Sequence, residues 1–119
     1  MQRQFLRCKL HQVRVTEANI NYTGSLTIDK DIMKEADIAP YEKLLISNIE
    51  NGARFETYAI PGPAGSKTIG LNGAAARLGA LGDKLIVMIF GIYDEGETVS
   101  PKVLIFDENN EIVKVIEAK

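Results

Sequence analysis

The feature of this sequence that most limits its fold is how often turn signals interrupt it. Extended segments such as "FLRCKLHQVRV" at 5–15 and "KLLISNI" at 43–49 are rich in apolar and β-branched residues, and stretches containing Gly, Pro, Asn or Asp separate them. No strand segment alternates with a long helix, so the βαβ rhythm of a parallel sheet is absent. The pattern predicts a mainly β fold of about six or seven short strands, and a small closed or half-closed β-barrel would best protect their edges.

Sequence signals also locate strands in the second half of the chain. The Asn-Gly pair in "ENGA" at 50–53 predicts a two-residue hairpin turn, followed by the strand "RFETYAI" at 54–60. The segment "KLIVMIFGIY" at 84–93 is apolar at both alternations, which predicts a strand buried on both faces. A C-terminal hairpin is expected from "KVLIF" at 102–106 and "IVKVIEA" at 112–118, joined by the turn "DENNE".

Two short helices are expected between the strands. The segment "IDKDIMKEADI" at 28–38 has an acidic start, apolar residues at helical spacing and an end before Pro40. The segment "LNGAAARLGALGD" at 71–83 predicts an alanine-rich helix that Asn72 or Gly73 caps and that ends at Gly79 or Gly82.

The first strand carries two cations beside apolar residues. The period of two places Lys9, His11, Val13 and Val15 on one face. If the two valines point into the core, Lys9 and His11 lie at the mouth of that same face.

Composition excludes several functional classes. A chain of 119 residues with 45% hydrophobic residues suits one compact domain, 1–119. A net charge of −2 without a run of like charges argues against nucleic-acid and membrane partners. The longest apolar run is far shorter than the roughly 18 residues of a spanning helix, and no signal peptide begins the chain, so a cytoplasmic protein is expected. One cysteine and one histidine cannot build an ordinary zinc site, and phosphate-loop, dinucleotide and nucleophile-elbow motifs are absent, so no metal is expected.

The stretch "NINYTGSLTID" at 19–29 raises a question about the bond between Gly24 and Ser25. Gly24 permits the positive φ of a strained turn, and the hydroxyl of Ser25 is within reach of the preceding carbonyl. This geometry allows the hydroxyl to attack the backbone. From the dipeptide alone an inert turn is the favoured interpretation, because such short motifs are common.

A wider set of motifs changes that interpretation. The segments "KLHQVRVTEANINYTGSLTID", "NGARFETYAI" and "LNGAAARLGALGD" have the order, spacing and chain length of the small bacterial aspartate 1-decarboxylases, and the chain resembles this family over most of its length. These are pyruvoyl-dependent enzymes that make β-alanine for pantothenate. The resemblance implies a double-psi β-barrel, a homotetramer with active sites at subunit interfaces, and self-cleavage into a β chain, 1–24, and an α chain, 25–119.

The resemblance also implies how Ser25 becomes the cofactor. Ser25 Oγ attacks the Gly24 carbonyl to give an ester, β-elimination releases Gly24 as a carboxylate, and hydrolysis of the resulting dehydroalanine releases ammonia. The pyruvoyl group left at residue 25 forms a Schiff base with L-aspartate and accepts electrons as carbon dioxide leaves, in place of pyridoxal phosphate. No metal takes part.

Further residues match the family's active site. The resemblance implies that Thr57 assists cleavage and contacts substrate and that Tyr58 donates a proton to the decarboxylated carbon. A β-favouring pair that merely packs is the alternative, and adjacent strand residues face opposite sides unless the strand ends, twists or meets another subunit. Arg54 would bind one substrate carboxylate, and Lys9 with His11 would bind the other. The alternative for Arg54 is a solvated charge, and the alternative for Lys9 is an exposed charge on an edge strand. For His11 the alternative is a structural imidazole.

The "NGAAA" segment and Tyr22 complete the implied site. Asn72 and the backbone N–H groups of Gly73, Ala74 and Ala75 would contact the substrate, since small side chains let a ligand approach the backbone. Simple capping of an alanine-rich helix is the alternative for Asn72. Tyr22 matches the family's active-site tyrosine, although a tyrosine before a turn is common.

Two other functions stay open at this point. One is a non-catalytic barrel of the same fold that keeps the Gly24–Ser25 turn uncut and acts as an interaction or nucleic-acid-binding module. The other is a family member that decarboxylates a different small acidic amino acid, because Ser47 stands where many relatives carry a bulky aromatic. Whether a helper protein assists maturation is open as well.

Overall fold

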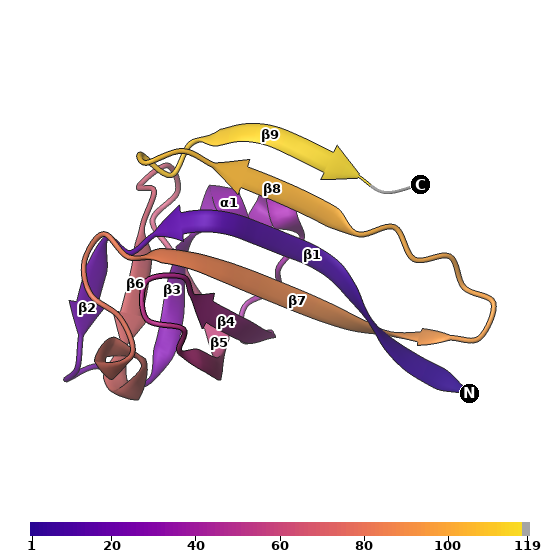
Figure 1. Cartoon of the computed structure of the whole chain (residues 1–119), viewed down its shortest axis with the longest axis horizontal. Helices are drawn as coiled ribbons and strands as arrows, with labels where there is room; N and C mark the ends of the chain where they lie inside the picture. The colour runs from indigo at the N-terminus through magenta and orange to yellow at the C-terminus, as the bar shows by residue number, and fades with distance from the viewer. Residues whose placement is uncertain (118–119) are drawn as a thin grey trace.

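The computed structural model describes residues 1–117, so the last two residues of the predicted domain 1–119 and the last residue of the predicted strand 112–118 lie outside the described residues. The structure is mainly β, as the sequence predicts, with one α-helix and one 3-10 helix (Figure 1). Its elements in chain order are β1 (Gln2–Arg14), β2 (Glu17–Asn19), β3 (Ser25–Asp29), α1 (Lys30–Ala36), β4 (Lys43–Asn48), β5 (Arg54–Gly62), β6 (Ile69–Asn72), η1 (Gly73–Arg77), β7 (Lys84–Asp94), β8 (Lys102–Phe106) and β9 (Ile112–Glu117).

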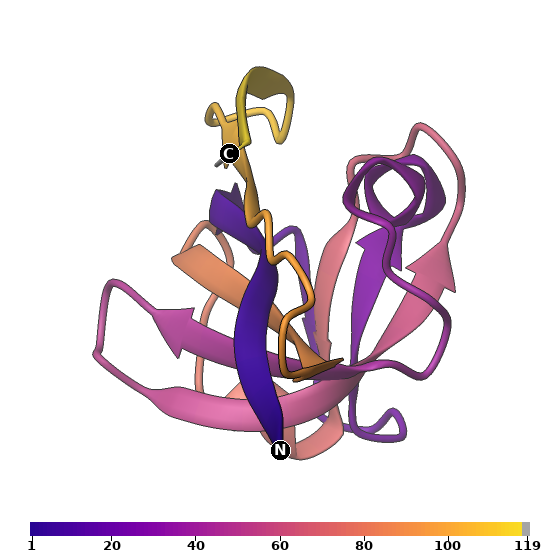
Figure 2. The same cartoon turned by 90° about the vertical axis from the view of Figure 1, so that its right-hand side faces the viewer.

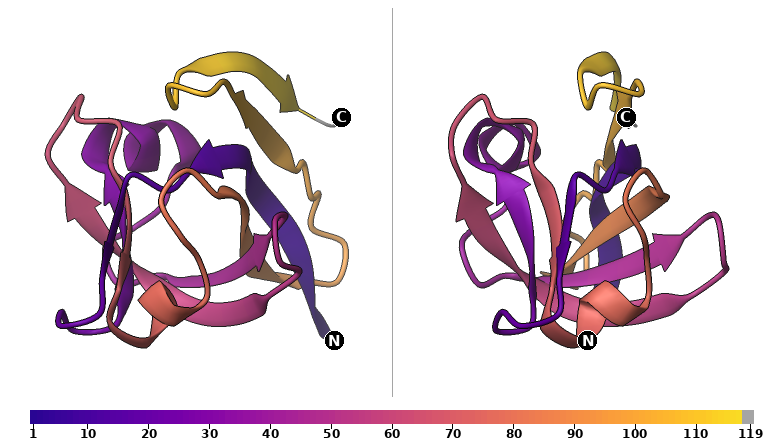
Figure 3. Two further views of the ribbon diagram at one scale, coloured as in Figure 1. Left: turned by 60° about the vertical axis from the view of Figure 1, so that its left-hand side comes forward. Right: turned by 90° about the vertical axis from the view of Figure 1, so that its left-hand side faces the viewer.

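The nine strands form one continuous sheet. Their order is β2-β6-β3-β5-β4-β7-β1-β8-β9, and β5 joins the two halves because its first part pairs with β4 and its second part with β3. Figure 3 shows the sheet curving around the core, and Figure 2 shows the β8–β9 hairpin standing out at one edge of the sheet. The closure of a double-psi barrel stays a prediction, because the pairings among residues 1–117 run from β2 to β9 without joining these two ends.

The prediction that Lys9 and His11 share a face with Val13 is wrong, because β1 contains a β-bulge. The register against β7 shifts between His11 and Val13, and Gln12 has a left-handed φ of 66°. The extra residue reverses the alternation, so that Leu10 and Val13 are both fully buried. Lys9 and His11 therefore lie on the outer face of the sheet. Since β1 lies between β7 and β8, an edge-strand role for Lys9 is also wrong.

The prediction that β7 is buried on both faces is wrong as well. Leu85, Val87 and Ile89 are fully buried, whereas Phe90 is 39% and Ile92 67% exposed. One face of β7 packs against the core. On the opposite face, the apolar side chains that follow Met88 are exposed in the single described chain.

The β4–β5 hairpin is present, but its loop is longer than the two residues predicted. Hydrogen bonds from Asn48 N to Ala53 O, 2.9 Å, and from Gly52 N to Asn48 O, 2.8 Å, close a loop over 49–52. The side chains of Asn48 and Asn51 each accept from the backbone N–H two residues later, at 2.9 Å. These Asx turns stabilise the longer loop, in which Gly52 has the positive φ.

The helices differ in how closely they match expectation. The α1 helix begins after its cap Asp29 and ends at Asp37 in the left-handed conformation, well before Pro40. The alanine-rich segment forms only the five-residue 3-10 helix η1 and ends before Gly79. The preceding strand β6 was not predicted; it supplies the antiparallel partner of β3. No helix within residues 1–117 is long and apolar enough to cross a membrane.

Candidate active site

Ser25 is the first residue of β3, a strand held between β5 and β6. Alternation along β3 sends Leu26 and Ile28 into the core, where both are fully buried. Ser25 and Thr27 therefore lie on the opposite face, although Ser25 itself is only 3% exposed. The sequence thus places a buried hydroxyl immediately after Gly24, on a strand that is fixed from both sides.

Asn72 connects β6 to the Ser25 hydroxyl. It lies directly opposite Ser25 in the antiparallel register, and its Nδ2 donates to Ser25 Oγ at 3.0 Å and to Thr27 Oγ1 at 2.8 Å. Its side chain makes no capping bond to η1, so the capping alternative is wrong. Ser25 Oγ in turn donates to the Thr23 carbonyl at 3.4 Å, which holds the oxygen on the side of the Gly24 peptide.

The backbone of Gly73 presses against the bond in question. Gly73 has φ +65°, and a Cβ added there would lie 2.7 Å from both Cα and N of Gly24 and 2.8 Å from the Tyr22 carbonyl oxygen. Only glycine permits both this φ and this close approach of two chain segments. The role of "NGAAA" in the structure thus includes shaping the 22–24 turn, which sequence reasoning missed.

Two adjoining cavities bring most of the predicted site residues together. The first, about 330 Å³, is lined by Tyr22, Thr23, Ser25, Thr27, Tyr58, Ile60 and Asn72. The second, about 320 Å³, is lined by Gly24, Phe55, Glu56, Thr57, Ala74, Ala75 and Leu78. Thr27 and Ile60 are additions that the sequence did not single out. The sequence pattern that could have identified them is the period of two along a strand, which places Thr27 on the same face as Ser25 and Ile60 on the same face as Tyr58.

The opposite orientations of Thr57 and Tyr58 are explained by these cavities. β5 runs without interruption through both residues, so one side chain points to each face. Gly24 borders the cavity of Thr57, and Ser25 borders the cavity of Tyr58. Adjacent positions on β5 thus border the Gly24 and Ser25 sides of the site in two different cavities. The Tyr58 ring also lies 6.3 Å from the ring of Tyr41.

The three side chains predicted to bind the substrate carboxylates lie elsewhere on the chain. Lys9, His11 and Arg54 line neither cavity; Arg54 is exposed at the start of β5, in agreement with a solvated charge on the single chain. Lys9 and His11 lie three strands away from β5 along the sheet, because β4 and β7 separate β1 from β5. Burial, and then the charge of Lys9, lower the pKa of His11 below its ordinary value of 6.5.

Two buried polar atoms on this outer face lack partners in the described chain: His11 Nδ1 and Ser47 Oγ. The registers align Ser47 with Ile86 and Ile86 with His11, so both lie in one row across β4, β7 and β1. Buried polar atoms without hydrogen bonds are uncommon in folded proteins. The row therefore has hydrogen-bonding capacity that the single chain does not use.

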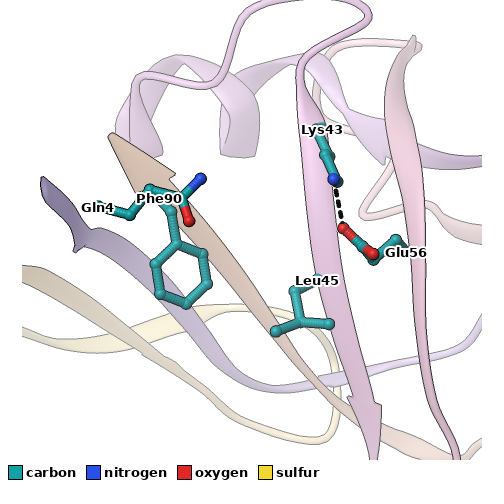
Figure 4. A pocket seen from close by; sticks show the side chains of 5 residues that line it. All are labelled: Gln4, Lys43, Leu45, Glu56 and Phe90. Atoms are coloured by element: carbon teal, nitrogen blue, oxygen red, sulfur yellow. Dashed lines mark ion pairs between the residues drawn. The ribbon is translucent and has the colours of Figure 1, made fainter. Parts of the chain in front are cut away.

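A third cavity on this outer face contains none of the predicted site residues. It measures about 250 Å³ and is lined by Gln4, Lys43, Leu45, Glu56 and Phe90 (Figure 4). Its lysine already pairs with Glu56, as the dashed line in Figure 4 marks. Within residues 1–117, no three His, Cys, Asp or Glu side chains gather in a way that could hold a metal ion.

Comparison with known proteins finds a matching family model and similar proteins. A family model described as aspartate decarboxylase matches residues 1–113. The aspartate 1-decarboxylase of Syntrophobacter fumaroxidans is 56% identical over 112 residues, which are 92% of this chain and 90% of that protein. The proteins of the same name from Thermosipho africanus and Staphylococcus epidermidis are 49% and 51% identical, covering 97% and 100% of this chain and 96% and 94% of their own lengths.

Proposed function

The chain belongs to the aspartate decarboxylase family of enzymes, and we propose that it converts L-aspartate to β-alanine and carbon dioxide with a pyruvoyl group made from its own Ser25. The observation that carries the proposal is the environment of the Gly24–Ser25 bond. A buried serine hydroxyl, held by Asn72, follows a glycine whose backbone is pressed against Gly73. The proposed setting is the cytoplasm, where the β-alanine would serve pantothenate synthesis.

Maturation begins with attack of Ser25 Oγ on the carbonyl carbon of Gly24. The new C–O bond forms as the C–N bond breaks, and the hydroxyl proton ends on the amine of residue 25. Loss of the Ser25 α-proton then expels Gly24 as a carboxylate from Cβ, and one water replaces the resulting enamine nitrogen, which leaves as ammonia. No oxidant is needed, and no second protein supplies an atom. Thr57 borders the carbonyl side of this bond, in keeping with a role in cleavage.

In the mature enzyme the pyruvoyl group supplies a carbonyl that captures the substrate amine and withdraws electrons from its α-carbon. The residues around it do the rest. Tyr58 lines the same cavity as residue 25 and delivers the proton that replaces the lost carboxylate. A phenol is a weak acid, but it suffices when the acceptor is a strongly basic carbon. Asn72, Tyr22 and the backbone of Gly73, Ala74 and Ala75 position the substrate.

Recognition of the two substrate carboxylates is assigned to Arg54 and to Lys9 with His11. The planar fork of Arg54 suits a bidentate carboxylate contact, and the ammonium group of Lys9 beside His11 offers a positive charge for the other carboxylate. Since these side chains do not reach Ser25 within one chain, the proposal includes a homotetramer in which neighbouring subunits complete each site. A maturation partner is not required by the chemistry.

Mass spectrometry under denaturing conditions tests the proposal. The wild-type chain is expected to yield residues 1–24 and a fragment of 95 residues, 25–119, lighter by one ammonia than its serine form. Ser25→Ala should stay intact, because it has no nucleophile. Tyr58→Phe should cleave normally but turn over at least about 100-fold more slowly, as expected for loss of a general acid. A wild-type chain that stays whole after prolonged warming, with or without bacterial cell extract, would contradict the proposal.

The substrate can be identified on the same fragment. Borohydride reduction in the presence of L-aspartate is expected to add substrate mass to fragment 25–119, whereas L-glutamate should add much less. One methylene is worth about 1 to 3 kcal/mol in a fitted pocket. If both amino acids were trapped equally, the proposed substrate would no longer be L-aspartate alone but a broader class of acidic amino acids.

A further inference from the structure

The side-chain amide of Asn72 donates hydrogen bonds to two hydroxyl groups. A side-chain NH₂ group has two hydrogens, and the structure directs one to Ser25 Oγ, 3.0 Å away, and the other to Thr27 Oγ1, 2.8 Å away. Both acceptors come from the same face of β3. Thr27 Oγ1 is thus a second partner of the same amide group that contacts Ser25.

Thr27 is itself held in place by two glycines on the flanking strands. A Cβ added at Gly62 of β5 would lie 2.9 Å from Thr27 Cγ2, and one added at Gly70 of β6 would lie 3.3 Å from Thr27 Cβ. The missing side chains therefore form a seat for the β-branched threonine. Because such a side chain has few accessible χ1 values, this seat directs its hydroxyl toward Asn72.

The orientation of the Asn72 amide decides the state of the nucleophile. When Nδ2 faces Ser25, the serine oxygen accepts one hydrogen bond, keeps a lone pair and donates its own proton to the Thr23 carbonyl at 3.4 Å. If the amide turned over, its oxygen would accept the serine proton and draw the hydroxyl toward β6. The hydrogen bond from Nδ2 to Thr27 Oγ1, in the seat formed by the two glycines, holds the amide beside Ser25 in the first arrangement.

We propose that Thr27 is a positioning residue for self-cleavage, acting through Asn72 to keep the Ser25 oxygen aimed at the Gly24 carbonyl. The inference rests on the proposed function, since it assigns a role in the maturation of the same bond. Thr27 does not react and gains no charge. Its contribution is the orientation of one amide group, so it should appear in the cleavage rate rather than in stability.

The test measures the rate of appearance of fragment 1–24 from freshly refolded precursor. Thr27→Val keeps the branched shape but removes the acceptor, and cleavage should slow by roughly 10-fold or more, as for a misplaced reacting group. Thr27→Ser restores the acceptor and should stay within about 3-fold of wild type. Thr27→Ala, which adds no methyl group, must show the same slowing and covers the case in which the valine does not fit.

Thr68→Val is the matched control. Thr68 is a buried threonine of the same region whose hydroxyl donates to Ser66 Oγ at 2.8 Å and, unlike that of Thr27, does not accept from Asn72. Like Thr27→Val, this variant removes one hydrogen-bonded threonine hydroxyl, and it should cleave at the wild-type rate; thermal unfolding of both variants compares their stabilities. Equal slowing in both threonine-to-valine variants would make the effect structural and overturn the proposal.

A double variant tests whether Thr27 works through Asn72. If it does, Thr27→Val should add less than about 2-fold slowing in an Asn72→Ala background, since residues that act as a unit are not additive. Full additivity of the two effects would overturn the role of Thr27 and leave the proposed function intact. Wild-type cleavage by Thr27→Val and Thr27→Ala would do the same. If the wild-type chain itself does not cleave, the proposed function fails and the inference fails with it.

Discussion

The side chain of Asp29 shows how one residue anchors the strand that carries Ser25. Asp29 ends β3, is fully buried, and accepts hydrogen bonds from the backbone N–H groups of Asp31 at 2.8 Å, Gly65 at 3.0 Å and Lys67 at 2.8 Å. It thereby caps α1 and ties the 63–67 loop to the sheet. A loop of Gly, Pro and Ser thus becomes a fixed part of the fold through one carboxylate.

Replacing Asp29 by asparagine should destabilise the protein by about 2 kcal/mol, because an NH₂ group would face a backbone donor and leave a buried N–H without an acceptor. Urea unfolding of the Ser25→Ala background, which keeps the chain whole, measures this difference. Asp107→Asn is the control, since Asp107 accepts two backbone N–H groups in a half-buried turn, and it should cost less than about 1 kcal/mol. Equal losses in both variants would contradict the anchoring role.

Acid should weaken the same anchor. Burial raises the pKa of Asp29, but the backbone N–H groups of Lys67, Asp31 and Gly65 and the charge of Lys67 outweigh burial and bring it below its ordinary value of 3.8. The unfolded chain therefore binds this proton more readily, and the stabilisation present above pH 4 is lost as the pH falls through the lowered pKa. Urea titrations between pH 3 and 6 should show a smaller loss of stability in acid for Asp29→Asn than for its parent.

At the scale of elements, the link between β6 and η1 controls the turn that would be cut. Gly73→Ala should slow self-cleavage by at least about 10-fold, because its Cβ would fall 2.7 Å from Gly24 N and Cα and displace the scissile segment. Gly52→Ala is a matched control: Gly52 has a similar φ of +74° but no atom within 4 Å of the added Cβ. Both variants carry the cost of a positive φ, about 1 kcal/mol. Slowing of cleavage by Gly52→Ala as well would show that general instability, and not the contact with Gly24, limits maturation.

Most strands could be predicted from local patterns, whereas their faces could not. Period-two patterns and turn residues located β1, β4, β5, β7 and the β8–β9 hairpin, because these signals are local. The bulge at Gln12 depends on the pairing of β1 with β7, so the alternation of apolar and polar residues in β1 could not predict it. The burial of β7 on one side only depends on what packs against it, which a single strand does not encode.

The candidate site was predictable for a different reason. Gly24, Ser25, Thr57, Tyr58 and Asn72 were identified through the resemblance of whole motifs, and the structure brings them around one bond. Composition and periodicity gave no such grouping. Thr27 was missed because its role depends on its neighbours Gly62 and Gly70, which are distant in sequence and meet only in the folded sheet.

At the scale of the whole molecule, the predicted site residues form two groups on one chain. Lys9 and His11 on β1 are separated from Tyr58 on β5 by β7 and β4, and three strand spacings amount to roughly 14 Å. Between these groups the outer face leaves Phe90 and Ile92 exposed, at the end of the long β1–β7 pair that Figure 1 shows. Exposed apolar side chains of this kind mark contact surfaces in many proteins.

Active sites shared between subunits would join these two groups, and complementation tests this directly. Ser25→Ala lacks the pyruvoyl precursor and Lys9→Ala lacks one proposed carboxylate contact, so each homo-oligomer should be inactive or nearly so. When the two chains are co-expressed with different tags and purified as mixed oligomers, random mixing gives an intact Ser25 and an intact neighbouring Lys9 at about a quarter of the sites. Activity near that fraction of wild type is therefore expected if Lys9 serves the neighbour's Ser25.

The control pairs Ser25→Ala with the Ser25→Ala/Lys9→Ala double variant and should stay inactive. Mixed oligomers verified by native mass spectrometry that show no activity above this control would assign Lys9 to the site of its own chain, whereas an active Lys9→Ala homo-oligomer would remove Lys9 from the site.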